Sequence, residues 1–383
     1  MTTPTRSLLD CLAEIRDFRL DRRKRHLLLD ILAIGICSVI ANGDDWTDME
    51  EFGETHFEWL KTWLSLPNGI PSHDTFRRVF TLLPPEQLHI CFAKWVQAAF
   101  SGRAVNHVAI DGKTMCASGR EKKEGSPGKE AVHLVSAFAS QHGLVLAQLK
   151  NGDKSNEIKA IPELLERLDI SGATVTIDAM GCQKNIARKI VGGGGEYILA
   201  LKDNQKKLHE TARKYFLAAQ LTEFAGLDHG HIQTRKEEHG RWERRDYHLL
   251  GNASFLDAKG EWAGLSHVGW VRRECRENGK VSVEDRFYLV SGAPTMKAFS
   301  EAVRGHWGIE NRLHWVLDVA FREDDCRITG SGAENLGVLR HMTVNLLREE
   351  KTCKRGIKGK RKRAAWDVGY LETVLKLDLS RDF

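Results

Sequence analysis

The sequence lacks the features that would indicate a membrane protein or an exported one. None of its apolar runs reaches the ~20 uninterrupted residues of a membrane-spanning helix. The nearest, Leu27–Ile40, is broken by Asp30 and follows a cluster of basic residues, so we interpret it as a core helix. Residues Met1–Asp10 do not show the basic-then-apolar order of a signal peptide. We therefore expect no membrane partner and a cytoplasmic location.

Cysteine pairs and repeats are also missing. The chain has eight cysteines, and no two of them form a C-x-x-C pair, which argues against a zinc ribbon or a thioredoxin-like redox site. Scattered cysteines in a chain without an export signal are typical of reduced, mostly buried thiols. The sequence has no internal repeat or low-complexity tract, and its 383 residues are enough for two or three ordinary globular domains.

Basic residues are concentrated near the end of the chain. The net charge is only +5, but eight of the thirteen residues from Lys351 to Arg363 are lysine or arginine and none is acidic. Such a density suits contact with DNA phosphates. We take the densest part as candidate DNA contacts, namely Lys360, Arg361, Lys362 and Arg363. A solvated basic tail explains the same composition equally well.

The spacing of apolar residues predicts an α/β protein that begins with a helical domain. Residues 1–102 show helical spacing interrupted by proline and glycine. From 103 to 350 the pattern predicts three antiparallel strands and then helix, strand, helix and strand, which is the order of a ribonuclease-H-like mixed sheet. We expect a strand-rich insertion at about 208–290 and helices from Met296 to Phe321 and from Ala333 to Leu347. Residues 351–383 are expected to form a basic tail.

Two aspartates end predicted strands of this sheet. Asp111 follows the apolar run His107–Ile110, and Asp178 follows Thr174–Ile177. Strand ends in open α/β sheets position reactive groups, and paired carboxylates are good ligands for hard cations such as Mg²⁺. Either aspartate alone could be a simple turn residue, Asp111 above all because Gly112 follows it. The element order favours the catalytic interpretation of the pair.

A third carboxylate lies in a late helical segment. His306, Glu310 and His314 are four residues apart, so they share one helix face beside two tryptophans. A zinc site made by these three side chains is a poor alternative, because they span two helical turns and do not form H-E-x-x-H. Taken alone, the face could also be merely solvated.

These motifs resemble those of bacterial insertion-sequence transposases of the DDE type, in particular the H-repeat-associated branch. The resemblance covers nearly the whole chain in order. It rests on A-I-D-G-K-T at 109–114, K-S-N-E-I at 154–158, T-I-D-A-M-G-C-Q at 176–183, L-K-D-N-Q at 201–205, H-G-R-W-E-R-R at 239–245, H-W-G-I-E-N-R-L-H-W-V-L-D at 306–318, E-D-D-C-R at 323–327 and A-E-N at 333–335. P-S-H-D-T-F at 71–76 resembles the associated helical domain.

The resemblance implies a catalytic site in which Asp111, Asp178 and Glu310 bind two Mg²⁺ ions, with Mn²⁺ as a substitute. The implied reaction is hydrolysis of double-stranded DNA at the terminal repeats of the element, followed by transfer of the 3′-hydroxyl into target DNA. The helical N-terminal domain is then expected to recognise the ends, and a homodimer to hold two ends together. We list further candidate DNA contacts near the cut as Lys113, Lys202, Arg241, Arg244, Arg245 and His306.

One departure separates this chain from transposases that form DNA hairpins. Those enzymes carry tyrosine, arginine and lysine around the third acid, whereas the corresponding residues here are Val303, His306 and Leu317. We therefore do not predict a hairpin intermediate. Two other functions remain open: a catalytically silent DNA-binding relative, and a ribonuclease-H-fold nuclease that cuts without joining. The acids Glu157 and Glu323-Asp324-Asp325 are expected to be structural.

Overall fold

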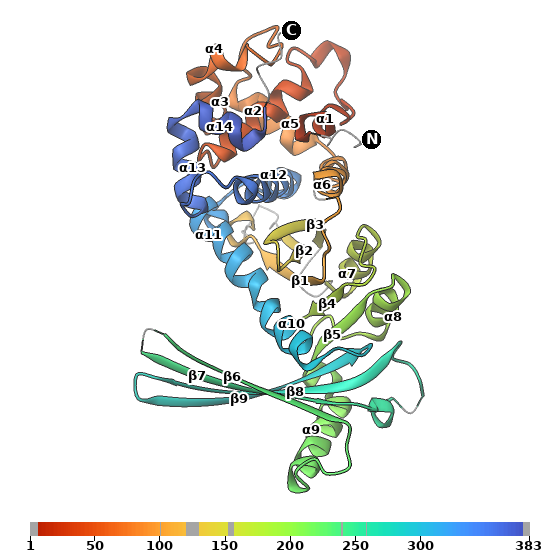
Figure 1. Cartoon of the computed structure of the whole chain (residues 1–383). Helices are drawn as coiled ribbons and strands as arrows, with labels where there is room; N and C mark the ends of the chain where they lie inside the picture. The colour runs from red at the N-terminus through yellow and green to blue at the C-terminus, as the bar shows by residue number, and fades with distance from the viewer. Residues whose placement is uncertain are drawn as a thin grey trace, which may run out of the picture.

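A helical body and a large β-sheet lie along the length of the molecule, with the helices at one end and the outer strands of the sheet at the other (Figure 1). The coordinates are those of a computed structural model. They describe residues 7–99, 101–119, 130–151, 157–238, 240–257 and 259–377, without the side chains of Arg23 and Ser254. Residues 154–156 of the K-S-N-E-I motif and His239 of H-G-R-W-E-R-R lie outside this description.

The first hundred residues form the predicted helices. They are α1 (Leu8–Ala13), α2 (Leu28–Ile40), α3 (Trp46–Thr55), α4 (Phe57–Leu60), α5 (His73–Leu82) and α6 (Pro85–Ala99). Helix α2 is buried along almost its whole length, which explains its continuous apolar sequence. The interpretation of this run as a core helix is confirmed. Within the described ranges, no helix combines the length and the apolar character needed to span a bilayer.

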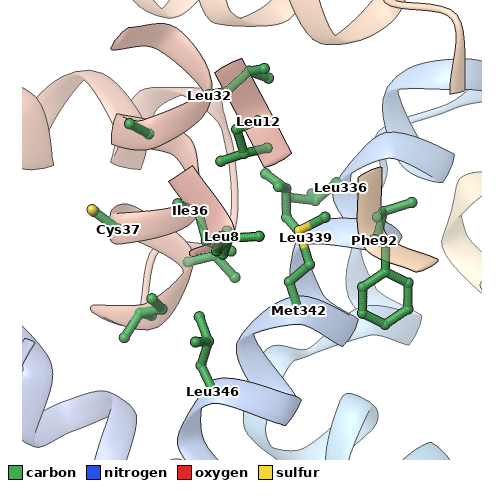
Figure 2. Close-up of a cluster of buried hydrophobic side chains, with 14 of the residues drawn as sticks. Leu8, Leu12, Leu32, Ile36, Cys37, Phe92, Leu336, Leu339, Met342 and Leu346 are labelled. Carbon is green, nitrogen blue, oxygen red and sulfur yellow. The ribbon is translucent and has the colours of Figure 1, made fainter. Parts of the chain in front are cut away.

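The last helices of the chain complete the helical body. Helix α12 (Gly330–Glu349) is followed by α13 (Ile357–Trp366) and α14 (Val368–Leu375). Figure 2 shows α12 side chains such as Leu336, Leu339 and Met342 facing Leu12 and Ile36 from the N-terminal helices. The helical body is thus built from both ends of the chain, and its boundaries differ from the predicted 1–102.

The prediction of a basic tail is wrong for most of residues 351–383, and burial explains why. The side chain of Arg361 is only 1% exposed and donates hydrogen bonds to the backbone carbonyls of Val39, Gly43 and Ala320. The ammonium group of Lys360 lies 3.1 Å from a carboxylate oxygen of Glu350 and is also buried. These two cations hold the helical body together, so the prediction that they contact DNA is not supported. Lys362 and Arg363 are exposed.

Five strands form the predicted mixed sheet in the middle of the molecule. They are β1 (His107–Thr114), β2 (His133–Ala139), β3 (Leu144–Asn151), β4 (Thr174–Ile177) and β5 (Glu196–Leu201), with α7 (Glu157–Glu166) before β4 and α8 (Lys184–Gly192) before β5. The order is β3-β2-β1-β4-β5, in which β1 pairs parallel to β4 and β4 parallel to β5. The predicted ribonuclease-H-like α/β fold class is confirmed.

The insertion extends this sheet instead of forming a separate unit. After α9 (Lys206–Leu221) come β6 (His229–Glu238), β7 (Arg241–Leu250), β8 (Leu265–Glu277) and β9 (Lys280–Ser291). These strands are 10 to 13 residues long, and they confirm the prediction of a strand-rich insertion. They add to β5 in the order β9-β8-β7-β6 and give a continuous nine-stranded sheet. We call these four strands the sheet extension.

A long helical segment crosses the sheet and connects it to the helical body (Figure 1). It consists of α10 (Met296–Ile309), a π-helical turn labelled η6 (Glu310–His314) and α11 (Trp315–Phe321), as the spacing from Met296 to Phe321 predicted. Short 3₁₀ turns complete the fold, namely η1 (Asp21–Arg23), η2 (Cys116–Ser118), η4 (Asp203–Gln205), η5 (Ala253–Leu256) and η7 (Glu323–Asp325).

Candidate active site

The register of two parallel strands places Asp111 beside Asp178. Ile110 of β1 is the partner of Ile177 of β4, and this is the last residue pair of that ladder. The next residue of each chain is an aspartate, so both carboxylates lie at the same edge of the sheet. The predicted end of the first strand at Asp111 is wrong, however, because β1 continues to Thr114 through its pairing with β2.

Glu310 is brought to this edge by the helical segment. It is the first residue of the π-helical turn η6, a feature that often occurs at functional sites. The predicted face of this segment points at the sheet. Nδ1 of His306 lies 3.0 Å from the hydroxyl of Thr176 on β4, and Nδ1 of His314 lies 3.6 Å from Oδ2 of Asp111 on β1.

One cavity of about 390 Å³ is lined by all three acids. We call it the acid pocket. Asp111, Asp178 and Glu310 share it with Lys202, which the sequence also predicted near the cut. The three widely separated carboxylates therefore converge on one place, as the resemblance implied.

The electrostatics of the acid pocket favour a cation. Burial, together with the neighbouring carboxylate of Asp178, raises the pKa of Asp111 to about 7. Burial and Asp178 also raise the pKa of Glu310. Oδ1 of Asp178 accepts hydrogen bonds from the backbone N–H groups of Met180 and Gly181, which fix its carboxylate at the strand end. The protein thus collects negative charge here without enough positive charge to balance it.

The two histidines on the helix face are neutral at physiological pH. Burial lowers the pKa of His306 to about 4 and that of His314 to about 3. His306 is held by Thr176, which also lies 2.8 Å from Nε2 of His107. His306 therefore lines the acid pocket as an uncharged side chain, and the phosphate contact predicted for it would have to come from a neutral imidazole.

The donor set fits a hard divalent cation better than zinc. Three carboxylates supply only oxygen ligands, as Mg²⁺ and Mn²⁺ prefer. His306 and His314 are directed at different partners, Thr176 and Asp111, so they do not form a zinc site with Glu310. Within the described ranges, no three His, Cys, Asp or Glu side chains are already close enough to hold one ion. The acids would have to move together around a bound cation.

A second layer of polar residues supports Asp111 from behind. Nε2 of His133 on β2 lies 2.7 Å from Oε1 of Glu157, and both side chains are buried. A β carbon at Gly112 would lie 2.5 Å from each of these two atoms, so only glycine fits next to Asp111. Glu157, which the sequence analysis regarded as structural, thus packs directly behind the catalytic strand.

Lys113 does not point to the acid pocket. Its ammonium group lies 2.7 Å from Asp318, 2.8 Å from Asp324 and 3.5 Å from Glu323. Although burial opposes the charged form, these carboxylates raise the pKa of Lys113. Its charge is fully compensated within the protein, so the predicted DNA contact at Lys113 is not supported. The acid cluster after Glu310 serves to hold this lysine.

The three candidate arginines of β7 lie on opposite faces of the sheet. Arg241 and Arg245 lie on the α10 side, where both contact Glu243, whereas Arg244 lies on the α9 side and pairs with Asp246 and Glu274. Alternation of side chains along a strand causes this separation. Four residues near the site were not predicted, namely Arg273, Arg286, Arg304 and Trp307. Arg286 and Trp307 line the acid pocket as well.

Comparison with known proteins gives two family matches, which meet near residue 100. The family model "Transposase DDE domain" matches residues 105–346, and the model "DDE_Tnp_1-associated" matches residues 9–96. The "H repeat-associated putative transposase YhhI" of Escherichia coli K12 is 39% identical over 97% of this chain and 98% of its own. The "Putative transposase YncI" of Escherichia coli O157:H7 is 40% identical over 96% of this chain and 94% of its own.

One solved structure shows a distant similarity. It is titled "Cryo-EM structure of piggyBac transposase synaptic complex with hairpin DNA (SNHP)" and is 10% identical, with a TM-score of 0.42, covering 97% of this chain and 77% of that chain. This similarity is too low to support a statement about either fold or function. The family match and the two relatives cover both the helical body and the sheet. On their strength, the chain belongs to the DDE transposase family.

Proposed function

We propose that this protein is an active DNA transposase whose catalytic residues are Asp111, Asp178 and Glu310. It would hydrolyse double-stranded DNA at the ends of its element and then join the new 3′-hydroxyl to target DNA. The convergence of the three acids on the acid pocket carries this proposal, because they come from β1, β4 and the η6 turn. Membership of the family supports it.

The same three carboxylates would hold two Mg²⁺ or Mn²⁺ ions. Such a pair stabilises the attacking and leaving oxygens of a phosphodiester displacement. The residues of the chain provide the frame for this. Asp178 is fixed by two backbone N–H groups, and Glu310 is exposed to solvent at the start of the η6 turn. The rigid strand ends keep Asp111 and Asp178 in register.

The residues around Glu310 do not suggest a hairpin intermediate. Val303 and Leu317 occupy two positions at which hairpin-forming enzymes carry polar side chains. Both are buried, with exposed fractions of 7% and 1%, and Val303 packs in a hydrophobic cluster with Phe299. Neither offers a charge or a hydrogen-bonding group to DNA, so we propose direct strand transfer without a hairpin.

Two further assignments complete the proposal. The helical body would recognise the terminal repeats, because the chemistry resides in the sheet and the segment that crosses it. A homodimer would hold two ends together, because joining an element requires both ends in one complex. Crosslinking of the protein in the presence and absence of end DNA would test the dimer.

The function is tested with purified protein, Mg²⁺ and DNA that carries the sequences flanking its gene. We expect a cut at the element end and, with a target plasmid, a joined product. Asp111→Ala and Glu310→Ala should abolish both reactions and leave end binding intact. Asp325→Ala is a matched control, because its side chain is 70% exposed and pairs with Arg322 outside the acid pocket.

The outcome separates the alternatives. Cutting without joining would identify a nuclease, and binding without cutting a catalytically silent relative. A shortened relative called "Inactive transposase YbfQ" is 42% identical to this chain but spans only 19% of it. Retained cleavage in Asp111→Ala or Glu310→Ala would remove the assignment of the active site.

A further inference from the structure

A second concave site adjoins the acid pocket on the α10 side of the sheet extension. It is a cavity of about 520 Å³ lined by residues of β6, β7, β8, β9 and α10. Arg286 and Trp307 line both this cavity and the acid pocket, so the two spaces meet at that pair. The guanidinium group of Arg286 lies over the indole of Trp307, 4.7 Å from its centre.

The charge of this cavity is concentrated around one carboxylate. Glu243 is buried and lies 3.1 Å from Arg241, 3.0 Å from Arg245, 2.8 Å from Arg273 and 3.8 Å from Arg304. One negative charge cannot balance four positive ones. Glu284 lies 3.9 Å from Arg273, and Glu277, which acts electrostatically on Arg241, lines the cavity together with Glu238. The four arginines therefore lie in a cavity lined by six cationic side chains and three carboxylates. We call these four arginines and Glu243 the arginine cluster.

The like charges of the cluster remain uncompensated at its centre. Burial and the nearby Arg304 lower the pKa of Arg245, which shows that the protein holds this cation at a cost. A buried carboxylate with excess arginine is a preorganised site for an anion, since each guanidinium group keeps donors for phosphate oxygens. The excess charge is therefore better explained by a ligand than by stability of the fold.

The cavity continues across α10. A neighbouring cavity of about 560 Å³ shares Lys236, Glu243, Arg245 and Arg304 with it and extends to Arg312. The two cavities and the acid pocket thus adjoin one another through shared lining residues, and we call the three together the groove. Each part has the volume of a small-ligand site, which suits successive nucleotides of one strand better than a duplex. A groove of cations with an aromatic ring at one end is typical of single-strand binding.

We propose that this groove binds a DNA strand in single-stranded form and leads it to the acid pocket. This inference rests on the proposed function and specifies its substrate. The arginine cluster would bind the phosphates, and the pair Arg286 and Trp307 would hold the nucleotide next to the cut. Duplex DNA would have to be opened at the element end before its strand enters the groove.

The test is a binding measurement that involves no catalysis. Asp111→Asn protein in EDTA is titrated with a fluorescent single-stranded 12-mer of thymidine and with a duplex of the same length, at several salt concentrations. We expect the single strand to bind more tightly. In the double variant Arg245→Gln and Arg304→Gln, single-strand affinity should fall at least tenfold. The slope of log affinity against log salt should fall by about 1.4, since each lost contact contributes about 0.7.

A matched pair on the other face of the same strands provides the control. Arg272→Gln with Arg276→Gln removes two charges from β8 on the α9 side, where Arg272 contacts Asp285 and Arg276 stacks on Trp242. This variant should keep its affinity. Arg304→Gln alone is the safeguard against misfolding. Arg304 is half exposed, and its one recorded ion pair with the described residues is the 3.8 Å contact with Glu243. This variant should still weaken single-strand binding.

Equal losses in both double variants, preferential loss of duplex binding, or unchanged single-strand binding would each overturn the inference. None of these results bears on the acids, because the assay contains no metal and no active carboxylate set. Conversely, loss of cleavage in Asp111→Ala concerns only the acids, because the arginine cluster is unchanged in that variant. The two proposals therefore fail separately.

Discussion

Nδ1 of His314 lies 3.6 Å from Oδ2 of Asp111, so a neutral imidazole lies beside one of the three proposed catalytic carboxylates. The imidazole comes from the η6 turn and the carboxylate from β1. This relationship ties the helical segment that carries Glu310 to the strand that carries Asp111. It also leads to the first prediction.

His314→Gln should weaken metal binding about 10- to 100-fold, because side chains that orient a metal ligand commonly contribute that much. Mn²⁺ affinity measured by electron paramagnetic resonance checks this without any DNA. The control is His142→Gln, since His142 is half-buried outside the acid pocket and bonds only the carbonyl of Ala104 among the recorded contacts. Unchanged Mn²⁺ affinity in His314→Gln would show that His314 does not orient the carboxylate of Asp111.

Metal binding and cleavage should rise with pH through about 7. Asp111 has a pKa of about 7 in the metal-free protein, and it must lose its proton to bind a cation. The apparent Mg²⁺ affinity should therefore fall roughly tenfold from pH 8 to pH 6, as expected for release of one proton. Isothermal titration calorimetry at several pH values measures it.

Asp111→Asn is the control for this pH dependence and has an effect of its own. The pKa of Asp111 is about 7 in the folded chain, compared with its usual 3.8. Ionisation of Asp111 therefore destabilises the fold increasingly as the pH rises from 3.8 to about 7, and the full loss of stability remains at higher pH. The variant should therefore melt at a higher temperature than the wild type at pH 8 and show a smaller difference at pH 4. A lower melting temperature at pH 8 would contradict the raised pKa.

Gly112→Ala should destabilise the protein by about 1–3 kcal/mol, the usual range for a forced contact in a packed interior. The new methyl group would lie 2.5 Å from His133 and from Glu157 and would push Asp111 out of register. Chemical denaturation measures the loss. In Gly192→Ala, at the end of α8, the methyl group meets no atom within 4 Å, so that variant should be neutral or slightly more stable.

Arg361→Ala should cost about 3–5 kcal/mol of folding free energy, as for other broken buried ion pairs. It removes the bonds to three backbone carbonyls and leaves Asp44 without this partner. Lys362→Ala, one residue further and exposed, should change stability by less than about 0.5 kcal/mol. If Arg361→Ala instead kept its stability and lost DNA affinity, the original prediction of a DNA contact would be restored.

The sequence was most informative where regular spacing and short motifs agreed. Short apolar runs and helical spacing predicted β1, β4 and the helical segment from Met296 to Phe321, and the family resemblance implied that the three acids meet. The end of the strand at Asp111 was wrongly predicted because a glycine can mark either a turn or a close packing contact within a strand. Here it leaves room for the pair of His133 and Glu157, a contact between strands and helices that local sequence cannot reveal.

Basic residues were the least predictable. Lys113 and Arg361 look like free cations in the sequence, yet the partners of Lys113 lie more than 200 residues away, and those of Arg361 on and after α2 lie more than 300 residues away. The arginine cluster was only half recognised, because Arg241 and Arg245 need Arg273 and Arg304 from other elements to form it. Strand alternation alone would have separated Arg244 from its neighbours.

Helix α12 packs against the N-terminal helices, so the core of the helical body cannot form until α12 has been synthesised. Ile36 and Leu339 belong to one core but are 339 − 36 = 303 residues apart. At about 5–20 residues per second, a ribosome needs roughly 15–60 s to make the second after the first. The nascent N-terminal helices must wait that long with an apolar surface uncovered, so this period is when chaperones would be expected to engage the chain.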